Sequence, residues 1–208
     1  MKVLSITLVT DGSSDRALIP IVEWLVAKKL NEHPFQVQLA EALPKHGKGL
    51  KNRISYALAH YNCDILIIHR DAEGEDWRIR FDEINQAIST VAFGETHMVS
   101  VIPVRMTEAW LLFDEMAVRR AAGNPVGKTA IKLSNLKKWE KEIDPKQLIL
   151  TALRDASELS GRRLAKFNAY EAKNRVAYLI RDFSVLNQLE SFCHFQKNLE
   201  SALELAIS

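Results

Sequence analysis

The feature that most constrains the fold is a short uninterrupted apolar run at Asp64–His69, DILIIH. A strand that is apolar on both faces needs cover on both faces, which is the situation inside a parallel sheet. Other segments are rich in β-branched residues or alternate in polarity, as strands do. These further predicted strands are Val3–Thr10, Phe35–Leu43 and Met98–Val104. Between them, apolar residues recur at three- and four-residue spacings, which predicts helices at Asp15–Leu30, Leu50–Tyr61, Trp77–Val91 and Thr107–Ala122.

This alternation predicts an α/β fold: an open, mainly parallel sheet of about four strands with helices on both faces. After Gly123 the strand signals stop, and the remaining apolar patterns are helical. We therefore expect an α/β core at residues 1–122 and an α-helical C-terminal part at residues 123–208 that packs on the core. The helices expected in this second part are Ser134–Glu142, Pro145–Ala156, Ala172–Phe183 and Asn187–Ile207.

The composition is that of an ordinary globular protein. Of 208 residues, 47% are apolar and 26% are charged, which excludes a disordered or collagen-like chain. No apolar run is long enough to cross a membrane, so we expect no membrane partner. The two cysteines, Cys63 and Cys193, lie far apart without zinc-ligand spacing. We expect them to be reduced, buried thiols in a cytoplasmic protein.

The charge is unevenly distributed along the chain. The net charge is only +2, but residues 118–181 hold 15 Lys and Arg against 6 Asp and Glu. Such a basic segment is compatible with contacts to a nucleic-acid backbone, and equally with the wet faces of amphipathic helices. The cations that we select as candidate nucleic-acid ligands are Arg162, Arg163, Lys166, Lys173 and Arg175.

Acidic residues follow three of the four predicted strands. Asp11 ends the first strand, Asp71 and Glu73 follow the third, and Glu108 follows the fourth. The carboxyl ends of parallel strands meet at one edge of the sheet, where α/β proteins form their sites. Residues two apart in an extended segment point the same way, so Asp71 and Glu73 should converge on one cation. Carboxylate oxygens suit Mg²⁺ or Mn²⁺.

Glycines and cations accompany these acids. Gly12 and Gly74 should allow the chain to turn sharply after the first and third strands. His69, Arg70 and Arg105 flank the acids and could attract substrate phosphates. The simpler interpretation of each is structural: a strand-end histidine, a salt bridge at the rim, and an Arg105–Glu108 pair across a helix start.

Two of these strings resemble elements of the TOPRIM fold, which is Rossmann-like. Asp11-Gly12-Ser13-Ser14-Asp15 resembles the acid-glycine element after its first strand, and Asp71-Ala72-Glu73 resembles its paired-acid element. More specifically, the chain resembles a bacterial TOPRIM-like family, similar to nucleases of the overcoming-lysogenisation-defect class and often encoded beside an ATPase. Further shared strings are Ile102-Pro103-Val104, Glu108-Ala109-Trp110-Leu111-Leu112, Asp144-Pro145-Lys146 and Ser191-Phe192.

The resemblance implies a metal-dependent nuclease in phage defence or mobile-element biology. Asp71, Glu73 and Glu108 would hold Mg²⁺ or Mn²⁺, which would activate a water and polarise a phosphoryl oxygen. Asp11 would act as general base or acid, or as ligand to a second metal, with Asp15 in support. The implied partners are DNA or RNA and an ATPase, and a homo-oligomer stays open.

Two departures from the family pattern keep other functions open. Asp11 is one methylene shorter than the usual Glu, and Glu73 is one longer than the usual Asp. The alternative is therefore a non-catalytic module that docks on an ATPase. A third class, a small hydrolase or nucleotide-binding protein, would need a phosphate-binding loop. Residues 123–129, GNPVGKT, have three residues between the glycines where that motif has four, so we interpret them as an ordinary loop.

Overall fold

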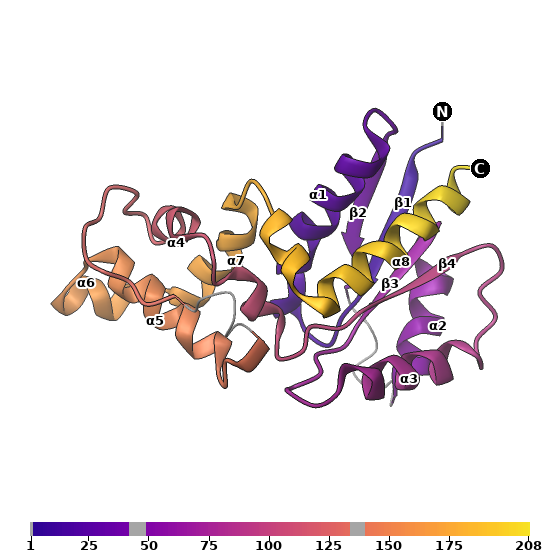
Figure 1. The fold of residues 1–208 in the computed structure, drawn as a ribbon, viewed down its shortest axis with the longest axis horizontal. Coiled ribbons are helices and arrows are strands. Elements are labelled where there is room, and N and C mark those ends of the chain that lie inside the picture. The colour runs from indigo at the N-terminus through magenta and orange to yellow at the C-terminus, as the bar shows by residue number, and fades with distance from the viewer. Residues whose placement is uncertain (1, 42–48, 134–139) are drawn as a thin grey trace.

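The computed structural model describes residues 2–41, 49–133 and 140–208. Within them, four strands form one sheet in the order β2-β1-β3-β4, with every neighbouring pair parallel (Figure 1). The strands are β1 Leu4–Val9, β2 Phe35–Leu39, β3 Ile65–His69 and β4 His97–Val101. The predicted α/β class is confirmed. β3 is the apolar run from the sequence, and all five of its residues are buried.

The helical elements follow the predicted order, with different boundaries. In the core they are η1 Ser13–Ala17, α1 Leu18–Leu30, α2 Leu50–His60, α3 Trp77–Ile88, η2 Thr107–Leu111 and α4 Glu115–Ala121. Beyond it they are α5 Pro145–Ser157, α6 Gly161–Lys166, α7 Ala169–Leu179, η4 Ser184–Gln188 and α8 Glu190–Ala206.

The differences from the predicted boundaries have local causes. The helix expected over Thr107–Ala122 divides into η2 and α4, because the Asp114 side chain accepts a hydrogen bond from the Ala117 backbone N–H and starts a new helix. The sequence pattern missed α6, which buries none of its residues and so has no apolar stripe. The helix expected over Ser134–Glu142 falls largely outside the described residues.

Two apolar layers sandwich the sheet. On one face, Ile6, Leu8 and Ile67 pack in a cluster with α1 and α8. On the other face, Leu66 and Ile68 pack in a second cluster with α2 and α3. Helices therefore cover both faces, as β3 requires by being apolar on both sides.

The helical C-terminal part shares the first of these clusters with the sheet. Residues of α5, α7 and α8 belong to the same buried cluster as β1 and β3. Trp110 of η2 lies at the junction, edge-on to Phe192 with ring centroids 5.2 Å apart. In Figure 1, α4 to α7 extend to the left while α8 returns along the sheet. One hydrophobic core thus joins residues on both sides of position 123.

Two further expectations concern the whole chain. Within the described ranges, no helix is both long and apolar enough to cross a membrane. Cys63 and Cys193 are both free, and both are half-buried rather than fully buried as the sequence predicts.

Candidate functional site

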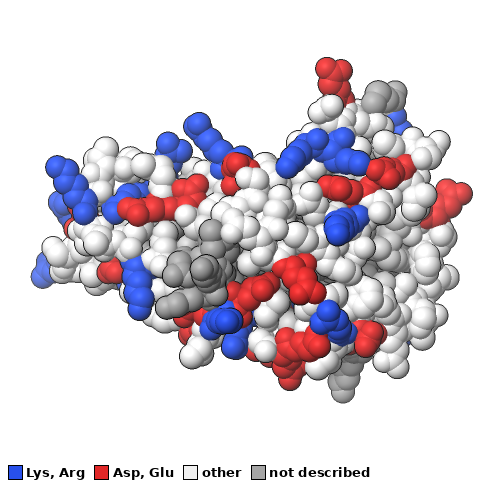
Figure 2. All heavy atoms as spheres, viewed as in Figure 1, with Lys and Arg blue, Asp and Glu red and all other residues white. Residues whose placement is uncertain are grey.

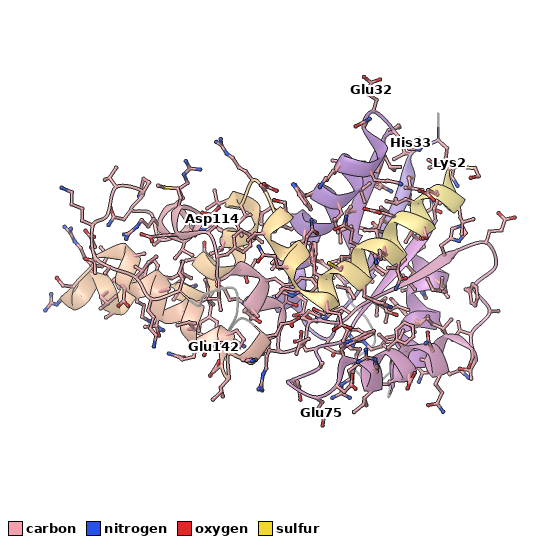
Figure 3. All side chains as sticks on the ribbon, in the orientation of Figure 1. Lys2, Glu32, His33, Glu75, Asp114 and Glu142 are labelled. Atoms are coloured by element: carbon pink, nitrogen blue, oxygen red, sulfur yellow. The ribbon has the colours of Figure 1, made fainter. Side chains whose placement is uncertain are left out.

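The candidate site lies at the carboxyl ends of the strands. Figure 3 shows Glu75, in the loop after β3, at the opposite end of the sheet from Lys2 and His33, which precede β1 and β2. Asp11 and Asp71 directly follow β1 and β3, and Glu108 lies in η2 after β4. The fold therefore brings the selected acids to the same edge of the sheet, as the sequence predicts.

At this edge the most deeply buried of the charged side chains is a histidine. His69, at the end of β3, is 1% exposed. Its Nε2 lies 3.0 Å from Asp71 Oδ1, and its Nδ1 lies 3.5 Å from Asp15 Oδ2. The Thr107 backbone N–H also donates to Asp71 Oδ1, at 3.2 Å. We call His69, Asp15, Asp71 and Thr107 the His69 cluster.

The pKa values of this cluster are shifted by burial and by charge. Burial lowers the pKa of His69, but the contacts with Asp15 and Asp71 outweigh it and raise that pKa to about 9. The imidazole is therefore a cation at neutral pH with an N–H on each ring nitrogen, and Nε2 lies within hydrogen-bond distance of Asp71. Burial raises the pKa of Asp71; contact with His69 opposes this, and the negative charges of Asp15 and Glu108 add to it. The negative charges of Asp15 and Glu108 therefore act on Asp71, which also contacts His69.

Glu108 is held by a cation from the helical part. Its Oε1 lies 2.6 Å from Lys173 Nζ of α7, and both side chains are more than nine-tenths buried. A buried carboxylate needs such a partner, because an unpaired charge is costly away from water. This corrects the expectation for Lys173: it lies inside the protein, on Glu108, and not on a surface open to nucleic acid.

Asp11 is exposed, and it is bound by two arginines. Its Oδ1 lies 2.6 Å from Arg53 Nη1 of α2 and 3.0 Å from Arg70 Nη1. Arg70 also pairs with Glu83 of α3 at 3.0 Å. The rim salt bridge considered for Arg70 is therefore present. Sequence reasoning missed Arg53, because nothing in a helical pattern 42 residues from Asp11 marks it as a partner.

Glu73 does not converge with Asp71. It adopts a positive φ of 55°, followed by Gly74 at 88°, so the strand-like alternation ends here. The Glu73 and Gly74 backbone N–H groups donate to the carbonyls of Arg105 and Val104, at 3.1 and 2.7 Å. This turn leaves the Glu73 side chain exposed. The expectation that residues 71 and 73 point the same way fails because it requires extended backbone at both positions.

The residues expected to support these acids also depend on local backbone conformation. Gly74 does use the conformational freedom of glycine, and the Arg105 guanidinium packs where a side chain at position 74 would lie. Arg105 contacts the Glu73 carbonyl through Nη1, at 3.4 Å. Gly12 has extended backbone with a φ of −152°, which any residue can adopt. Its N–H donates to Asp15 Oδ2 at 3.1 Å, which ties Asp15 to the end of β1.

The remaining candidate cations lie on the surface of the helical part. Arg162, Arg163 and Lys166 are all exposed on α6. Arg175 is exposed on α7, and it donates to the Ala121 carbonyl at 2.9 Å. Figure 2 shows Lys and Arg side chains around the left-hand end of the molecule, where Figure 1 places α4, α5 and α6.

The side chains present do not fit the divalent metal that the resemblance implies. Among the described residues, no three His, Cys, Asp or Glu side chains are placed so that they could hold a metal ion. The physical reason is that the acids are already paired with cations of this chain. Glu108 is paired with Lys173, Asp11 with arginines and Asp71 with His69. A metal would first have to displace these cations.

Comparisons of the chain with protein-family models, with curated proteins and with solved structures give no match. One signal for the His69–Asp71 contact was present: the two residues lie two apart at a strand end, on one face. No signal marks the pairing of Glu108 with Lys173, which are 65 residues apart.

Proposed function

We propose that this chain is a TOPRIM-like module that binds a nucleic-acid backbone through its helical part and has no catalytic metal of its own. The observation that carries the proposal is α6. It buries none of its six residues, and three of them are the exposed cations Arg162, Arg163 and Lys166. In the part of the chain described, none of these three is paired with a carboxylate.

The contrast with the strand-end acids supports the same proposal. There, Asp71 and Glu108 are matched by cations of the same chain, whereas the α6 cations have no carboxylate partner among the described residues. Unpaired surface cations on one short helix suit a polyanion, because each phosphate contact releases a condensed counterion. Such contacts position a backbone without reading its sequence, so we expect little base preference.

Fluorescence anisotropy with labelled DNA and RNA strands tests this proposal. A variant with Arg162→Ser, Arg163→Ser and Lys166→Ser should bind at least about tenfold more weakly than the unmodified chain. The slope of log affinity against log salt should become shallower by about 2 to 3, roughly one for each cation that no longer meets a phosphate. The matched control carries Lys28→Ser, Lys29→Ser and Lys51→Ser, which removes the same charge from α1 and α2. Equal losses in both variants would show that only net charge matters and would overturn the proposal.

Metal-dependent phosphodiester cleavage is the second candidate. Asp71 favours it, because this carboxylate at the carboxyl edge of the sheet is 22% exposed and stands near two further acids. Nicking of plasmid DNA and of RNA in Mg²⁺ or Mn²⁺ decides between the candidates. If Asp71→Asn abolishes a cleavage that Asp82→Asn, a change at an exposed carboxylate of α3, preserves, the chain is a nuclease and the non-catalytic proposal fails. Cleavage that survives both changes belongs to a contaminant.

The ATPase partner implied by the resemblance stays a separate prediction. It is tested by co-expression with a neighbouring ATPase gene product and by co-purification. An α6 variant that loses nucleic acid yet keeps the ATPase would place the two partners on different surfaces.

A further inference from the structure

The loop between α4 and α5, whose glycine spacing does not fit the phosphate-loop motif, holds an anion in the structure. Residues 124–129, here called the 124–129 loop, connect α4 to the residues before α5. The backbone N–H groups of Lys128 and Thr129 both point at one oxygen, Oε1 of Glu158, with N–O distances of 2.5 and 2.6 Å. Successive backbone N–H groups that converge on one point form an anion-binding concavity. The loop therefore has the donor geometry of a phosphate site without the motif spacing.

The anion is supplied by the same chain. Glu158 ends α5 in the left-handed region, with a φ of 53°, and is exposed. The backbone N–H groups of Thr129 and Lys128 lower the pKa of its carboxyl group. Glu158 is thus an anion at neutral pH, and solvent reaches it. An incoming anion could take its place without opening the hydrophobic core.

A second and independent feature lies at the same point. Arg119 of α4 is only 6% exposed. Its Nε and Nη2 are used by Glu115, at 2.9 and 2.7 Å, and Nη2 also donates to the Thr129 carbonyl, at 2.8 Å. Its Nη1 is buried and finds no hydrogen-bond partner within the described residues. Buried donors are nearly always paired in native proteins, so an unpaired guanidinium nitrogen calls for a missing acceptor.

Gly127 brings these features together. A Cβ built at Gly127 would lie 3.1 Å from Arg119 Nη1, 3.0 Å from Glu158 Oε1 and 2.5 Å from Asn124 Nδ2. The unpartnered arginine nitrogen and the bound carboxylate therefore both lie close against Gly127, an approach that is possible because residue 127 has no side chain. A carboxylate offers two oxygens, whereas a phosphate offers three or more and can accept from the loop, from Arg119 and from Asn124 together.

We propose that the 124–129 loop is a binding site for a phosphate group and that Glu158 occupies it until a phosphate displaces it. The proposal deepens the proposed function by naming the group recognised, and it rests on that function only for the source of the phosphate. α6 begins three residues after Glu158, so a strand held by α6 can bring an end phosphate to the loop. Free inorganic phosphate is the other source of the same chemistry.

Calorimetric titration with inorganic phosphate, at constant ionic strength in chloride, tests the site. Because Glu158→Ala removes the competing carboxylate, this variant should bind phosphate at least about tenfold more tightly than the unmodified chain. Glu32→Ala is the matched control, since it removes one exposed carboxylate with the same change in net charge. Figure 3 shows Glu32 far from Asp114, which begins α4. Phosphate affinity of Glu32→Ala should equal that of the unmodified chain.

A second variant adds a methyl group beside the Arg119 nitrogen. Gly127→Ala, added to Glu158→Ala, should abolish the gain in phosphate affinity, because its methyl group would meet Asn124 and Arg119. Cooperative thermal unfolding of each variant checks that it is folded. If Gly127→Ala prevents folding, Glu158→Gln replaces it; this change keeps the acceptor oxygen, removes the charge and should give an intermediate affinity. Equal phosphate affinities in Glu158→Ala and Glu32→Ala would overturn the proposal.

Oligonucleotides separate the two sources of phosphate. A 5′-phosphorylated strand should bind Glu158→Ala several-fold more tightly than the same strand with a 5′-hydroxyl group if the site takes a nucleic-acid end. Inorganic phosphate binding with no such preference identifies free phosphate as the ligand and leaves the site intact. The α6 triple variant should still bind inorganic phosphate, so failure of nucleic-acid binding and failure of this site remain distinguishable.

Discussion

The strand-end edge and the 124–129 loop each hold acids and cations, but they neutralise them differently. At the strand ends, Glu108 and Lys173 are buried together, and His69 is buried among carboxylates. At the loop, Glu158 is exposed and is held by backbone N–H groups. Burial removes water as an alternative partner, so the buried charges depend on each other, whereas the exposed one can be exchanged. Acidic residues at an edge therefore do not by themselves identify a metal site.

The largest effect should come from breaking the buried pair. In Lys173→Met, the Glu108 carboxylate stays buried without a cation, and we expect the free energy of unfolding to fall by about 3–5 kcal/mol. Urea unfolding followed by circular dichroism measures this change.

A double variant distinguishes charge from packing at this site. Adding Glu108→Gln to Lys173→Met removes both charges, so most of the lost stability should return. A double variant as unstable as the single one would mean that Lys173 stabilises the protein through packing. The Glu108–Lys173 charge pair would then not distinguish the strand-end edge from the 124–129 loop.

The pH dependence of stability tests the charge of His69. Its pKa rises from an ordinary 6.5 to about 9 on folding, so its contribution is fully present below pH 6.5 and is lost as the pH rises through 9. The shift corresponds to about 3 kcal/mol at most. Urea midpoints at pH 6.5 and 9.5 should differ more for the unmodified chain than for His69→Gln. Parallel losses in both proteins would mean that His69 is not the titrating group.

Helix-cap variants test whether the sheet and the helical C-terminal part unfold together. Asp144 accepts a hydrogen bond from the Gln147 backbone N–H at the start of α5, at 2.8 Å. Asp76 does the same for Arg78 in α3, at 3.0 Å. Asp144→Ala and Asp76→Ala should each cost about 1 kcal/mol of global stability. If Asp144→Ala instead gives a second, separate transition in thermal unfolding, the helical part unfolds independently of the sheet.

The smallest effect should come from the exposed strand-end acid. Asp11→Asn weakens its pairs with Arg53 and Arg70, but the Asp11 side chain is 43% exposed and water replaces them. We expect a loss below about 1 kcal/mol that shrinks further in high salt. A loss as large as that of Lys173→Met, measured by the same urea titration, would remove the contrast between buried and exposed charges.

Much of the fold follows from short-range patterns in the sequence. The apolar run of β3 required cover on both faces, and the intervening helical spacings supplied it. Asp114 and Asp144 cap helices locally, through residues three positions away. By contrast, α6 has no buried face, so its sequence carries no hydrophobic periodicity that would predict a helix.

The sequence by itself determined which charges arrive at the carboxyl edge of the sheet, because the order of strands and helices places every strand end there. Only the tertiary structure decided how those charges are used. Lys173 reaches Glu108 from α7, and Arg53 reaches Asp11 from α2. Glu73 turns outward because its backbone pairs with Arg105. Pairings across 42 or 65 residues depend on how the helices pack, and no local spacing encodes that.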